Sequence, residues 1–536
     1  MHPSLRSHRP IIMGRQGAVA SNHPVATQAG LDVLRAGGTA MDATIAVSLT
    51  LGVVEPHMSG LGGDGFFNIH TGDGSGTCVN ATGAAPEAAT VARYRAAGGV
   101  PVQGPLSIQT PGLLAGLAML HAAHGTLPWA RLVAPAEEAA REGFAATHAY
   151  RHFAEENRRR LWPDAASAAR FLDGGEAPAL GALVVQPELA ETLAEIGREG
   201  AEGFYRGRLA ARLAAGIGTA GGLVAGADLA ACTAERQAPI SVAYRGFEVR
   251  QTPPNSTGFS FLQMLRIVER FDVAALGWAS PALIHLLVEA KKRAFLDREA
   301  HGTDPRLGDV PLERLLSAGH AAAHAAAIDL GRAARLPVRP MAETDTTYFC
   351  VVDRAGRAVS AIQSLNSAFG SGVTAGDTGV LMNNRMAYWH LDDGHPNQLR
   401  PGQRVRHTMN APMIFRDGAL WGVLGTPGAD NQVQANLQVL VAMADFGLDP
   451  QQAVEAPRWT SSQPGQAANY PHGGDETLTL EAGLAAAAPG LEALGHRVKL
   501  VPPLEGACSV AAIRVLENGM RAAGSDPRRD GWAAAY

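Results

Sequence analysis

The sequence predicts a globular α/β (α+β) protein, in which a long helix-rich part precedes a shorter part rich in strands. Its 536 residues are 46% hydrophobic and 18% charged, enough apolar surface for one large core or two moderate ones, which excludes a disordered scaffold. Apolar residues recur at helical spacing up to about residue 330, whereas β-branched and aromatic residues gather in short runs after residue 346.

The expected helices lie mainly in the first two thirds of the chain. Residues 24–36 carry apolar side chains near helical spacing, and Gly37-Gly38 supplies the left-handed exit that a helix end favours. A second helix is expected over residues 41–51, and similar patterns cover residues 129–142 and 281–297. A proline-containing stretch of few large apolar residues then ends near residue 345, and we interpret its end as an exposed linker.

The strands are expected after this linker. Residues 347–352 and 358–362 flank a turn-like segment that contains Gly356, so they predict a hairpin. Residues 420–424 predict a further strand, followed by a turn and by a helix with Asp430 at its N-cap and its end near Gly447. A strand, turn and helix in this order direct free backbone N–H groups toward one place.

A glycine-rich loop, HMSGLGGDGFFNIH over residues 57–70, predicts close backbone packing. A nucleotide-binding interpretation is weak, because the spacing differs from the phosphate-binding loop pattern and no preceding strand is evident.

Charge and cysteine usage limit the partners. Lys plus Arg amounts to 45 and Asp plus Glu to 50, with no basic block, so nucleic acid is not an expected partner. The four cysteines form no C-x-x-C or C-x-x-H pair, which argues against a zinc knuckle and a dense disulfide framework and favours buried free thiols. We expect no metal or other cofactor.

The amino-terminal residues lack the apolar core of a secretory signal, so a cytoplasmic location is expected and a periplasmic one is less favoured. The most apolar stretch, residues 45–54, is about half of the roughly 20 residues needed to span a bilayer. No membrane association is therefore expected.

The junction Asp345-Thr346-Thr347 is the first candidate for chemistry, because a hydroxyl residue stands between the linker and a buried-looking strand. Taken alone, it is more typical of an ordinary strand start. Six motifs, however, occur in the order seen in γ-glutamyltransferases, and the chain resembles that family over about residues 17–530. They are residues 54–63 (VEPHMSGLGG), 346–353 (TTYFCVVD), 364–372 (SLNSAFGSG), 376–384 (GDTGVLMNN), 425–428 (GTPG) and 456–459 (APRW).

The resemblance implies an N-terminal nucleophile hydrolase, with a four-layer αββα sandwich and a precursor that cuts itself between Asp345 and Thr346. Residues 1–345 would form the large subunit and residues 346–536 the small one, together one structural unit. Thr346 would then be nucleophile and base at once, because a free α-amino group titrates near 8 and can deprotonate its own side-chain hydroxyl.

Other roles transfer by position in the motifs. Ser364 matches a threonine that hydrogen-bonds the nucleophile, and Asn366 matches an asparagine that helps bind substrate; both also fit ordinary strand and turn residues. Gly428 and Ala429 match a glycine pair whose N–H groups hold the oxyanion. The Cβ of Ala429 narrows the tolerated φ, so the shape of that site is expected to change.

The residues that would clamp a γ-glutamyl group depart from the family pattern. Thr82 stands where an arginine grips the α-carboxylate, and Tyr388 stands where an acid receives the α-ammonium. Arg385 replaces a neutral or acidic contact, and His407-Thr408 replaces a serine pair. A slip in the alignment would instead bring residues such as Asp392, Asp393, Arg93 or Arg95 into these roles.

We therefore predict an amidohydrolase with altered acyl specificity, which takes a small or acidic acyl group held by Arg385 or Arg406. It would resemble the oxamate-amidohydrolase and cephalosporin-acylase-like branches. The alternatives are a true γ-glutamyltransferase or glutathione hydrolase, and an unprocessed scaffold without activity.

Arg385 and Arg406 also fit solvated surface charges, and His57 fits either a substrate contact or an ordinary hydrogen-bonded histidine. The expected partners are a small amide and the two subunits, with higher association left open.

Overall fold

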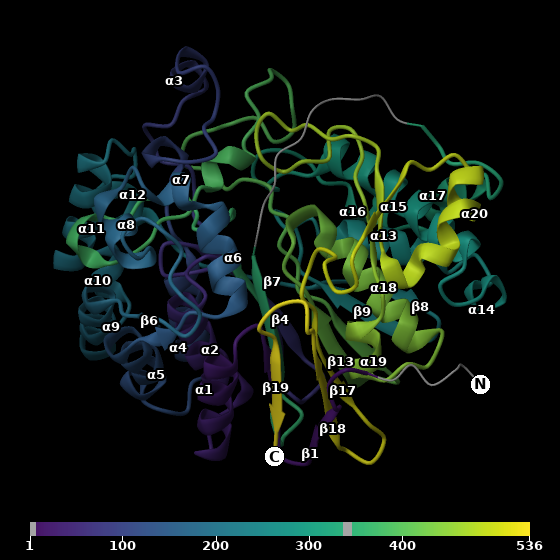
Figure 1. The fold of residues 1–536 in the computed structure, drawn as a ribbon, viewed down its shortest axis with the longest axis horizontal. Coiled ribbons are helices and arrows are strands. Elements are labelled where there is room, and N and C mark those ends of the chain that lie inside the picture. Colours follow the sequence, from purple (N-terminus) through teal and green to yellow (C-terminus); the bar gives the residue numbers. More distant parts are fainter. Residues whose placement is uncertain (1–6, 336–345) are drawn as a thin grey trace.

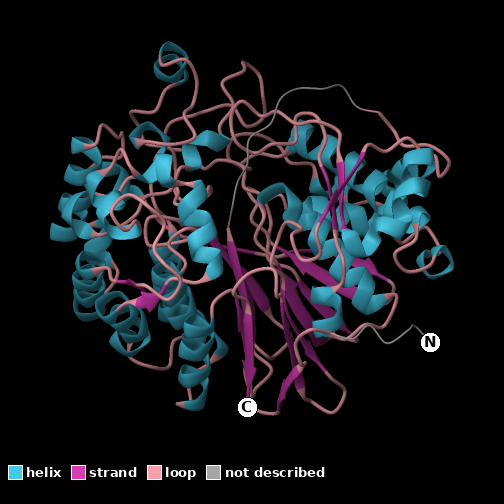
Figure 2. Cartoon of the chain, viewed as in Figure 1, coloured by secondary structure: helices cyan, strands magenta, loops and turns pink. Residues whose placement is uncertain are grey.

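Two seven-stranded antiparallel sheets lie face to face, and helices cover the outer face of each, so the molecule has four layers in the order αββα (Figures 1 and 2). The computed structural model describes residues 7–335 and 346–536. The four-layer sandwich predicted from the resemblance is therefore confirmed.

The strands of sheet I, in spatial order, are β1 (Ile12–Gly14), β18 (Arg521–Ser525), β17 (Ala511–Val515), β13 (Ala419–Gly425), β12 (Met413–Arg416), β9 (Phe247–Gln251) and β8 (Ile240–Tyr244). Those of sheet II are β19 (Trp532–Ala535), β2 (Ala18–Ser21), β10 (Thr347–Val352), β11 (Ala358–Ser364), β3 (Asp64–His70), β4 (Gly76–Ala81) and β7 (Glu235–Gln237). Two small sheets join β14 (Trp459–Ser461), β15 (Leu478–Glu481) and β16 (Val498–Val501), and β5 (Phe144–Ala145) with β6 (Leu183–Val184).

The helices divide between the two outer layers (Figure 1). Those on the side of sheet II are α1 (Pro24–Arg35), α2 (Ala40–Val54), α4 (Leu113–His124), α5 (Trp129–Glu142), α6 (His148–Glu156), α7 (Arg158–Leu161), α8 (Ala165–Phe171), α9 (Pro187–Glu199), α10 (Glu202–Tyr205), α11 (Arg208–Thr219) and α12 (Gly226–Ala231). Those on the side of sheet I are α13 (Gly258–Val268), α14 (Val273–Leu276), α15 (Pro281–His301), α16 (Leu312–Leu315), α17 (Ala318–Ala326), α18 (Gln432–Ala444), α19 (Pro450–Glu455) and α20 (Ala488–Ala493). Helix α3 (Val91–Ala96) and the short turns η1 (Pro105–Ser107), η2 (Gly376–Thr378), η3 (Arg385–Tyr388), η4 (Ala429–Asn431) and η5 (Ala482–Ala487) complete the set.

Strand β10 shows that sheet II is covered on both faces. Tyr348 and Cys350 pack into the core between the sheets, whereas Phe349 and Val351 pack into the core under the helices. Successive side chains of a strand point to opposite faces, so a run that is apolar at every position suits a strand covered on both sides. The predicted hairpin, β10 and β11, is confirmed.

The predicted helices are present as α1, α2, α5 and α15, and α15 continues to His301. The N-cap predicted at Asp430 is wrong, because α18 begins at Gln432 after the η4 turn. The Asp430 carboxylate instead accepts a hydrogen bond from Arg298 Nη1 at 2.5 Å. The end of the predicted linker lies outside the described residues.

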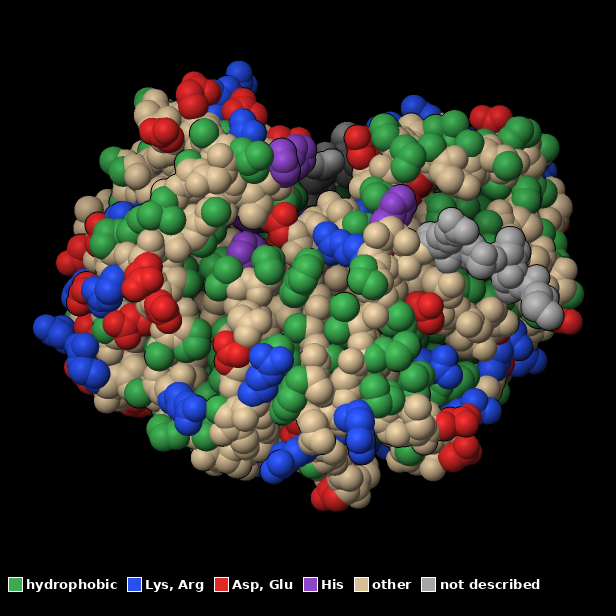
Figure 3. Space-filling model, turned by 60° about the horizontal axis from the view of Figure 1, so that its bottom comes forward, with side chains coloured by type: hydrophobic (Ala, Val, Ile, Leu, Met, Phe, Trp, Pro, Cys, Tyr) green, Lys and Arg blue, Asp and Glu red, His purple; other side chains and the backbone are tan. Residues whose placement is uncertain are grey.

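The surface carries mixed charge. Acidic and basic side chains are interspersed over the face drawn in Figure 3, as the nearly balanced composition leads one to expect. The four cysteines are free thiols, and three of them are buried. Within residues 7–335 and 346–536, no helix has the length and apolar character that crossing a bilayer requires.

Candidate active site

Four polar residues form a row at one end of sheet II. Ser364 of β11 lies opposite Asp64 of β3. Thr347 lies opposite Gln363, so the same register continued by one residue places Thr346 opposite Ser364. The β3–β4 register, continued in the same way, places Thr82 opposite Asp64. Residues that lie opposite one another on antiparallel strands share a face of the sheet, so residues far apart in sequence form a single polar row.

The row faces the space between the sheets. Thr347, one residue after Thr346, turns its side chain toward the helical layer, where its hydroxyl donates to Glu55 Oε2 at 2.6 Å. Gln363, one residue before Ser364, likewise donates from Nε2 to the Ser48 carbonyl of α2 at 3.0 Å. Because side chains alternate along a strand, Thr346 and Ser364 point the other way. All four row residues are buried.

Hydrogen bonds connect this end of sheet II to the turn that follows β13 in sheet I. Asn22 Nδ2 donates to Thr347 Oγ1 at 3.2 Å, and Ser509 Oγ donates to Asn22 Oδ1 at 2.9 Å. The Ser509 N–H donates to Thr426 Oγ1 at 3.1 Å. Thr426 is two residues before Gly428, so the turn predicted to hold the oxyanion is tied to the residue that follows Thr346.

Gly428 and Ala429 both adopt positive φ, 117° and 47°. A Cβ on Gly428 would lie 2.5 Å from Cys508 Sγ, so this position requires glycine. Ala429 opens the η4 turn directly before α18, where backbone N–H groups lack carbonyl partners within the helix. A cleft of about 760 Å³ opens beside this turn and is lined also by Arg497, Lys499 and Arg529.

Asn366 forms a tight turn beside Ser364. Its N–H donates to Ser364 Oγ at 2.7 Å, and its Nδ2 donates to Asn469 Oδ1 at 2.9 Å and to the Asn384 carbonyl at 3.2 Å. The backbone φ of Asn366 is 87°. Its buried Oδ1 has no hydrogen-bond partner within the described part of the chain, so one amide acceptor remains available beside the polar row.

A buried group that we name the Asp64 cluster consists of Asp64, Arg385, Tyr388, His407 and Thr408. Arg385 Nε donates to Asp64 Oδ2 at 3.2 Å, and the guanidinium lies 4.5 Å from the centre of the Tyr388 ring. The hydroxyls of Tyr388 and Thr408 are 3.0 Å apart. His407 Nε2 is 3.9 Å from Asp64 Oδ2. The structure therefore brings four of the predicted substrate-binding residues together around an acid from the row.

Burial determines the electrostatics of this cluster. It raises the pKa of Asp64, and the nearby Arg385 charge only partly offsets that effect. Burial, together with the charges of Arg385 and Arg404, holds the pKa of His407 well below its usual range, so the imidazole is neutral. Among the described residues, Arg385 Nη2 and both ring nitrogens of His407 have no hydrogen-bond partner. These buried polar groups are available to a ligand.

Arg406 belongs to a second buried group, the Glu299 network, formed by Arg298, Glu299, Arg406 and Asp430. Arg406 Nη2 donates to Glu299 Oε2 at 3.0 Å, and Arg298 Nε donates to Glu299 Oε1 at 2.9 Å. Arg298 also binds Asp430, the residue after Ala429. The interpretation of Arg385 and Arg406 as solvated surface charges is wrong, because both side chains are buried and each is paired with a carboxylate.

The other candidates have different surroundings. Arg95 and Asp393 pair with each other at 2.9 Å on the surface, outside the polar row. His57 stacks on Phe153, and burial lowers its pKa well below the usual value. Its Nδ1 has no hydrogen-bond partner among the residues with described positions. Asp345 lies outside the described residues.

Sequence reasoning missed Asp64 and Glu55. The available signal was their position, because Glu55 precedes the glycine-rich loop of residues 57–70 and Asp64 lies within it, in a stretch that is otherwise mostly apolar.

Comparison with known proteins shows what the whole chain is similar to. Residues 26–536 match the Gamma-glutamyltranspeptidase family. The chain is 38% identical to the Glutathione hydrolase-like YwrD proenzyme of Bacillus subtilis (strain 168), over 97% of this chain and 99% of the relative. It is 34% identical to the Oxamate amidohydrolase proenzyme of Klebsiella pneumoniae, over 97% and 98%. The crystal structure of cephalosporin acylase from Bacillus halodurans superposes with a TM-score of 0.91 at 33% identity, over 100% of this chain and 98% of that chain.

Proposed function

Because the chain belongs to the γ-glutamyltranspeptidase family, whose members act on amide bonds, we propose that it is a self-processing threonine amidohydrolase with Thr346 as its nucleophile. Its substrate is a small amide whose acyl part ends in a compact anionic group. One observation carries this proposal. The polar row aligns Thr346 with Ser364 and Asp64, and Asp64 binds the buried Arg385, whose Nη2 has no hydrogen-bond partner among the described residues.

Processing would begin with attack of Thr346 Oγ1 on the carbonyl carbon of Asp345. The peptide C–N bond breaks as the ester C–O bond forms, and the threonine nitrogen takes the proton. Water then hydrolyses the ester, which leaves a carboxylate on Asp345 and a free α-amino group on Thr346. This amine titrates near 8 in model peptides, so a usable fraction is neutral at pH 7.

In turnover, the Thr346 amine accepts the hydroxyl proton as Oγ1 attacks the amide carbon. The oxygen that becomes negative accepts hydrogen bonds from the N–H groups of the Gly428–Ala429 turn, an effect worth about 3 kcal/mol per donor. The leaving nitrogen takes the proton from the amine, and water hydrolyses the acyl ester. Ser364, opposite Thr346 in the register, helps orient the nucleophile.

The Asp64 cluster favours one compact anion over a γ-glutamyl group. A γ-glutamyl group brings both a carboxylate and an ammonium, and each needs a charged partner in a closed pocket. Thr82 and Tyr388 are uncharged, and Asp64 is already bound to Arg385. Arg385 Nη2 and neutral His407 supply hydrogen-bond donors, as a small carboxylate requires. The similarity to an oxamate amidohydrolase supports this choice, because oxamate carries a carboxylate next to its amide carbonyl.

Processing is tested first, with Thr346→Ala and the matched control Thr347→Ser. The native chain and the control should give two polypeptides on a denaturing gel, and N-terminal sequencing of the lighter one should begin at Thr346. The Thr346→Ala chain should stay whole and inactive. A native chain that remains uncut would support the unprocessed scaffold instead.

Specificity is tested with a panel of amides: oxamate, neutral small amides, and γ-glutamyl-p-nitroanilide with and without a dipeptide acceptor. We expect turnover of oxamate-like amides to exceed that of the γ-glutamyl compound. In Arg385→Lys, the KM for anionic amides should rise more than that for neutral ones. Robust γ-glutamyl release that is accelerated by dipeptides would favour the transferase.

A further inference from the structure

Three side chains outside the active site converge on one point between two helices. Asp297 lies on α15, and His320 and His324 lie one turn apart on α17. The two Nε2 atoms are 2.7 and 2.9 Å from Asp297 Oδ2 and 2.9 Å from each other. Each side chain is 14–21% exposed, so the site lies near the surface and is open to small ions.

No arrangement of protons on neutral imidazoles satisfies all three contacts. If both Nε2 atoms carry hydrogen and donate to Asp297, two N–H groups face each other at 2.9 Å. If one of them lacks hydrogen, its lone pair faces the lone pairs of the carboxylate oxygen instead. A cation held by the two nitrogen atoms and the oxygen removes both conflicts, because each of the three then offers a lone pair to it.

The surroundings of Asp297 suit a ligand. Gln263 of α13 donates from Nε2 to Asp297 Oδ2 at 2.7 Å, and such bonds from outside the ligand set orient metal-binding carboxylates. Within the described part of the chain, Asp297 forms no ion pair with an arginine or a lysine.

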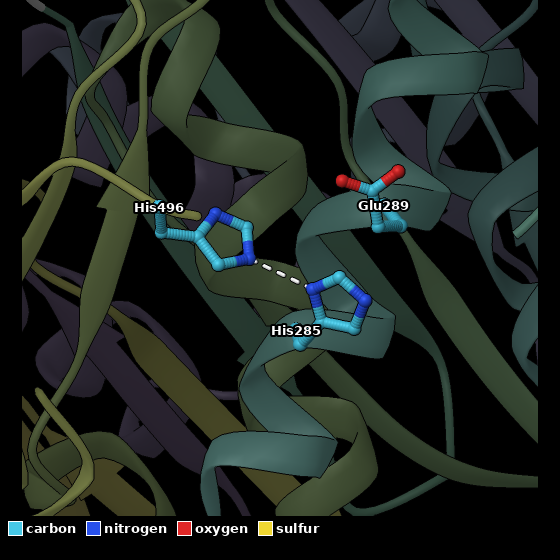
Figure 4. Close-up of side chains that lie close together, drawn as sticks. All are labelled: His285, Glu289 and His496. Carbon is cyan, nitrogen blue, oxygen red and sulfur yellow. Dashed lines mark hydrogen bonds between the residues drawn. The ribbon is translucent and has the colours of Figure 1, made fainter. Parts of the chain in front are cut away.

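Two other clusters of histidines with a carboxylate occur among the described residues. They differ from the Asp297 cluster because basic side chains already bind their carboxylates. In one, His285 and His496 point toward each other, but Glu289 lies to one side of them (Figure 4). The Glu289 carboxylate is bound by Lys292 at 3.1 Å and by Arg293 at 2.8 Å. A carboxylate already neutralised by two cations attracts a metal ion weakly.

The other cluster, Glu299 with His390 and His395, has the same weakness, because Arg298 and Arg406 both bind Glu299. Of the three clusters, only that of Asp297, His320 and His324 keeps its acid free of arginine and lysine partners among the described residues.

We propose that Asp297, His320 and His324 bind one divalent transition-metal ion of the zinc class, with water in the remaining position. Two imidazole nitrogens and one carboxylate oxygen form a donor set typical of zinc. Among the described residues, α17 is the last helix before Thr346, so the ion ties α17 to α15 and, through Gln263, to α13. The site is structural and separate from the amide chemistry.

The test uses the full-length purified protein, stripped with a chelator and titrated with ZnCl₂ by calorimetry, with bound metal measured by mass spectrometry. We expect about one zinc ion per native chain and loss of that ion in the His320→Ala/His324→Ala double variant. The matched control, His152→Ala, removes an exposed histidine that also faces an acid four residues away, and it should keep the ion. MgCl₂ should not bind at this site.

Two further measurements keep the proposal falsifiable if the double variant is unstable. Asp297→Asn keeps the size of the side chain but weakens the donor, so it should bind zinc at least about tenfold more weakly. Zinc should raise the Tm of the native protein more than that of Asp297→Asn, with amide hydrolysis unaffected in either. Equal zinc stoichiometry and affinity in the native protein and the ligand variants would overturn the assignment.

Discussion

Two buried ion-pair networks differ in how completely their hydrogen bonds are used. One includes Asp64 of the polar row, and the other includes Asp430, which follows the Gly428–Ala429 turn. In the Asp64 cluster, Arg385 Nη2 and both nitrogens of His407 lack partners within the described chain. In the Glu299 network, no buried side-chain nitrogen or oxygen of its four described members is without a partner. Buried polar groups are almost always satisfied in proteins, so we expect a ligand to contact the unpaired polar atoms of the Asp64 cluster.

The same comparison separates two arginines that the sequence offers as equal candidates. Arg385 pairs with Asp64, which belongs to the row that contains Thr346, whereas Arg406 pairs with Glu299. Through Glu299 and Arg298, Arg406 connects to Asp430, the residue that follows the Gly428–Ala429 turn. We therefore propose that Arg385 binds substrate and that Arg406 supports the turn.

The largest expected effect comes from Arg385→Met. It leaves the fully buried Asp64 without its cation, and breaking a buried pair from one side costs about 3–5 kcal/mol. Urea unfolding should show this loss, and turnover of anionic amides should fall with it. The double variant Asp64→Asn/Arg385→Met should recover most of the stability but not the activity. If Arg385→Met alone were as stable as the native protein, the pair would not be the centre of the cluster.

Asp430→Asn should act on the turn and not on acyl recognition. It weakens the bond from Arg298 that holds the residue after Ala429, so we expect kcat to fall about tenfold to a hundredfold with KM nearly unchanged. Arg406→Gln, two contacts farther away, should show a smaller loss of the same kind. A rise in KM specific to anionic amides in either variant would place substrate in the Glu299 network instead.

Histidines near both networks predict acid sensitivity. Burial, aided by the charge of Arg406, lowers the pKa of His395 to about 4, and the pKa of His407 is also depressed. Between pH 6.5 and 4 these histidines bind protons in the unfolded chain but stay neutral in the folded chain. The free energy of unfolding therefore falls as the pH drops through this window. His395→Gln should reduce the loss between pH 7 and pH 5 by about 1–2 kcal/mol, measured by urea unfolding at both values.

Sequence motifs, through the family resemblance, predicted the four-layer fold and named the candidates Thr346, Ser364 and Thr82, which the strand register aligns in one row. They could not show the partner of Arg385, since Asp64 lies 321 residues away and was part of a loop interpreted only as a close-packed turn. The i,i+4 spacing of His320 and His324 is visible in the sequence, but Asp297 joins them only when α15 packs beside α17.

The smallest expected effect, that of Ala429→Gly, tests whether the turn next to the Glu299 network depends on its unusual side chain. Alanine at φ 47° is strained by roughly 1 kcal/mol, and glycine removes this strain while adding a similar entropy to the unfolded chain. Stability should therefore change by less than about 1 kcal/mol, and kcat should stay within about twofold because the N–H group remains. A large gain in γ-glutamyl turnover would mean that this Cβ, and not the Asp64 cluster, sets the acyl specificity.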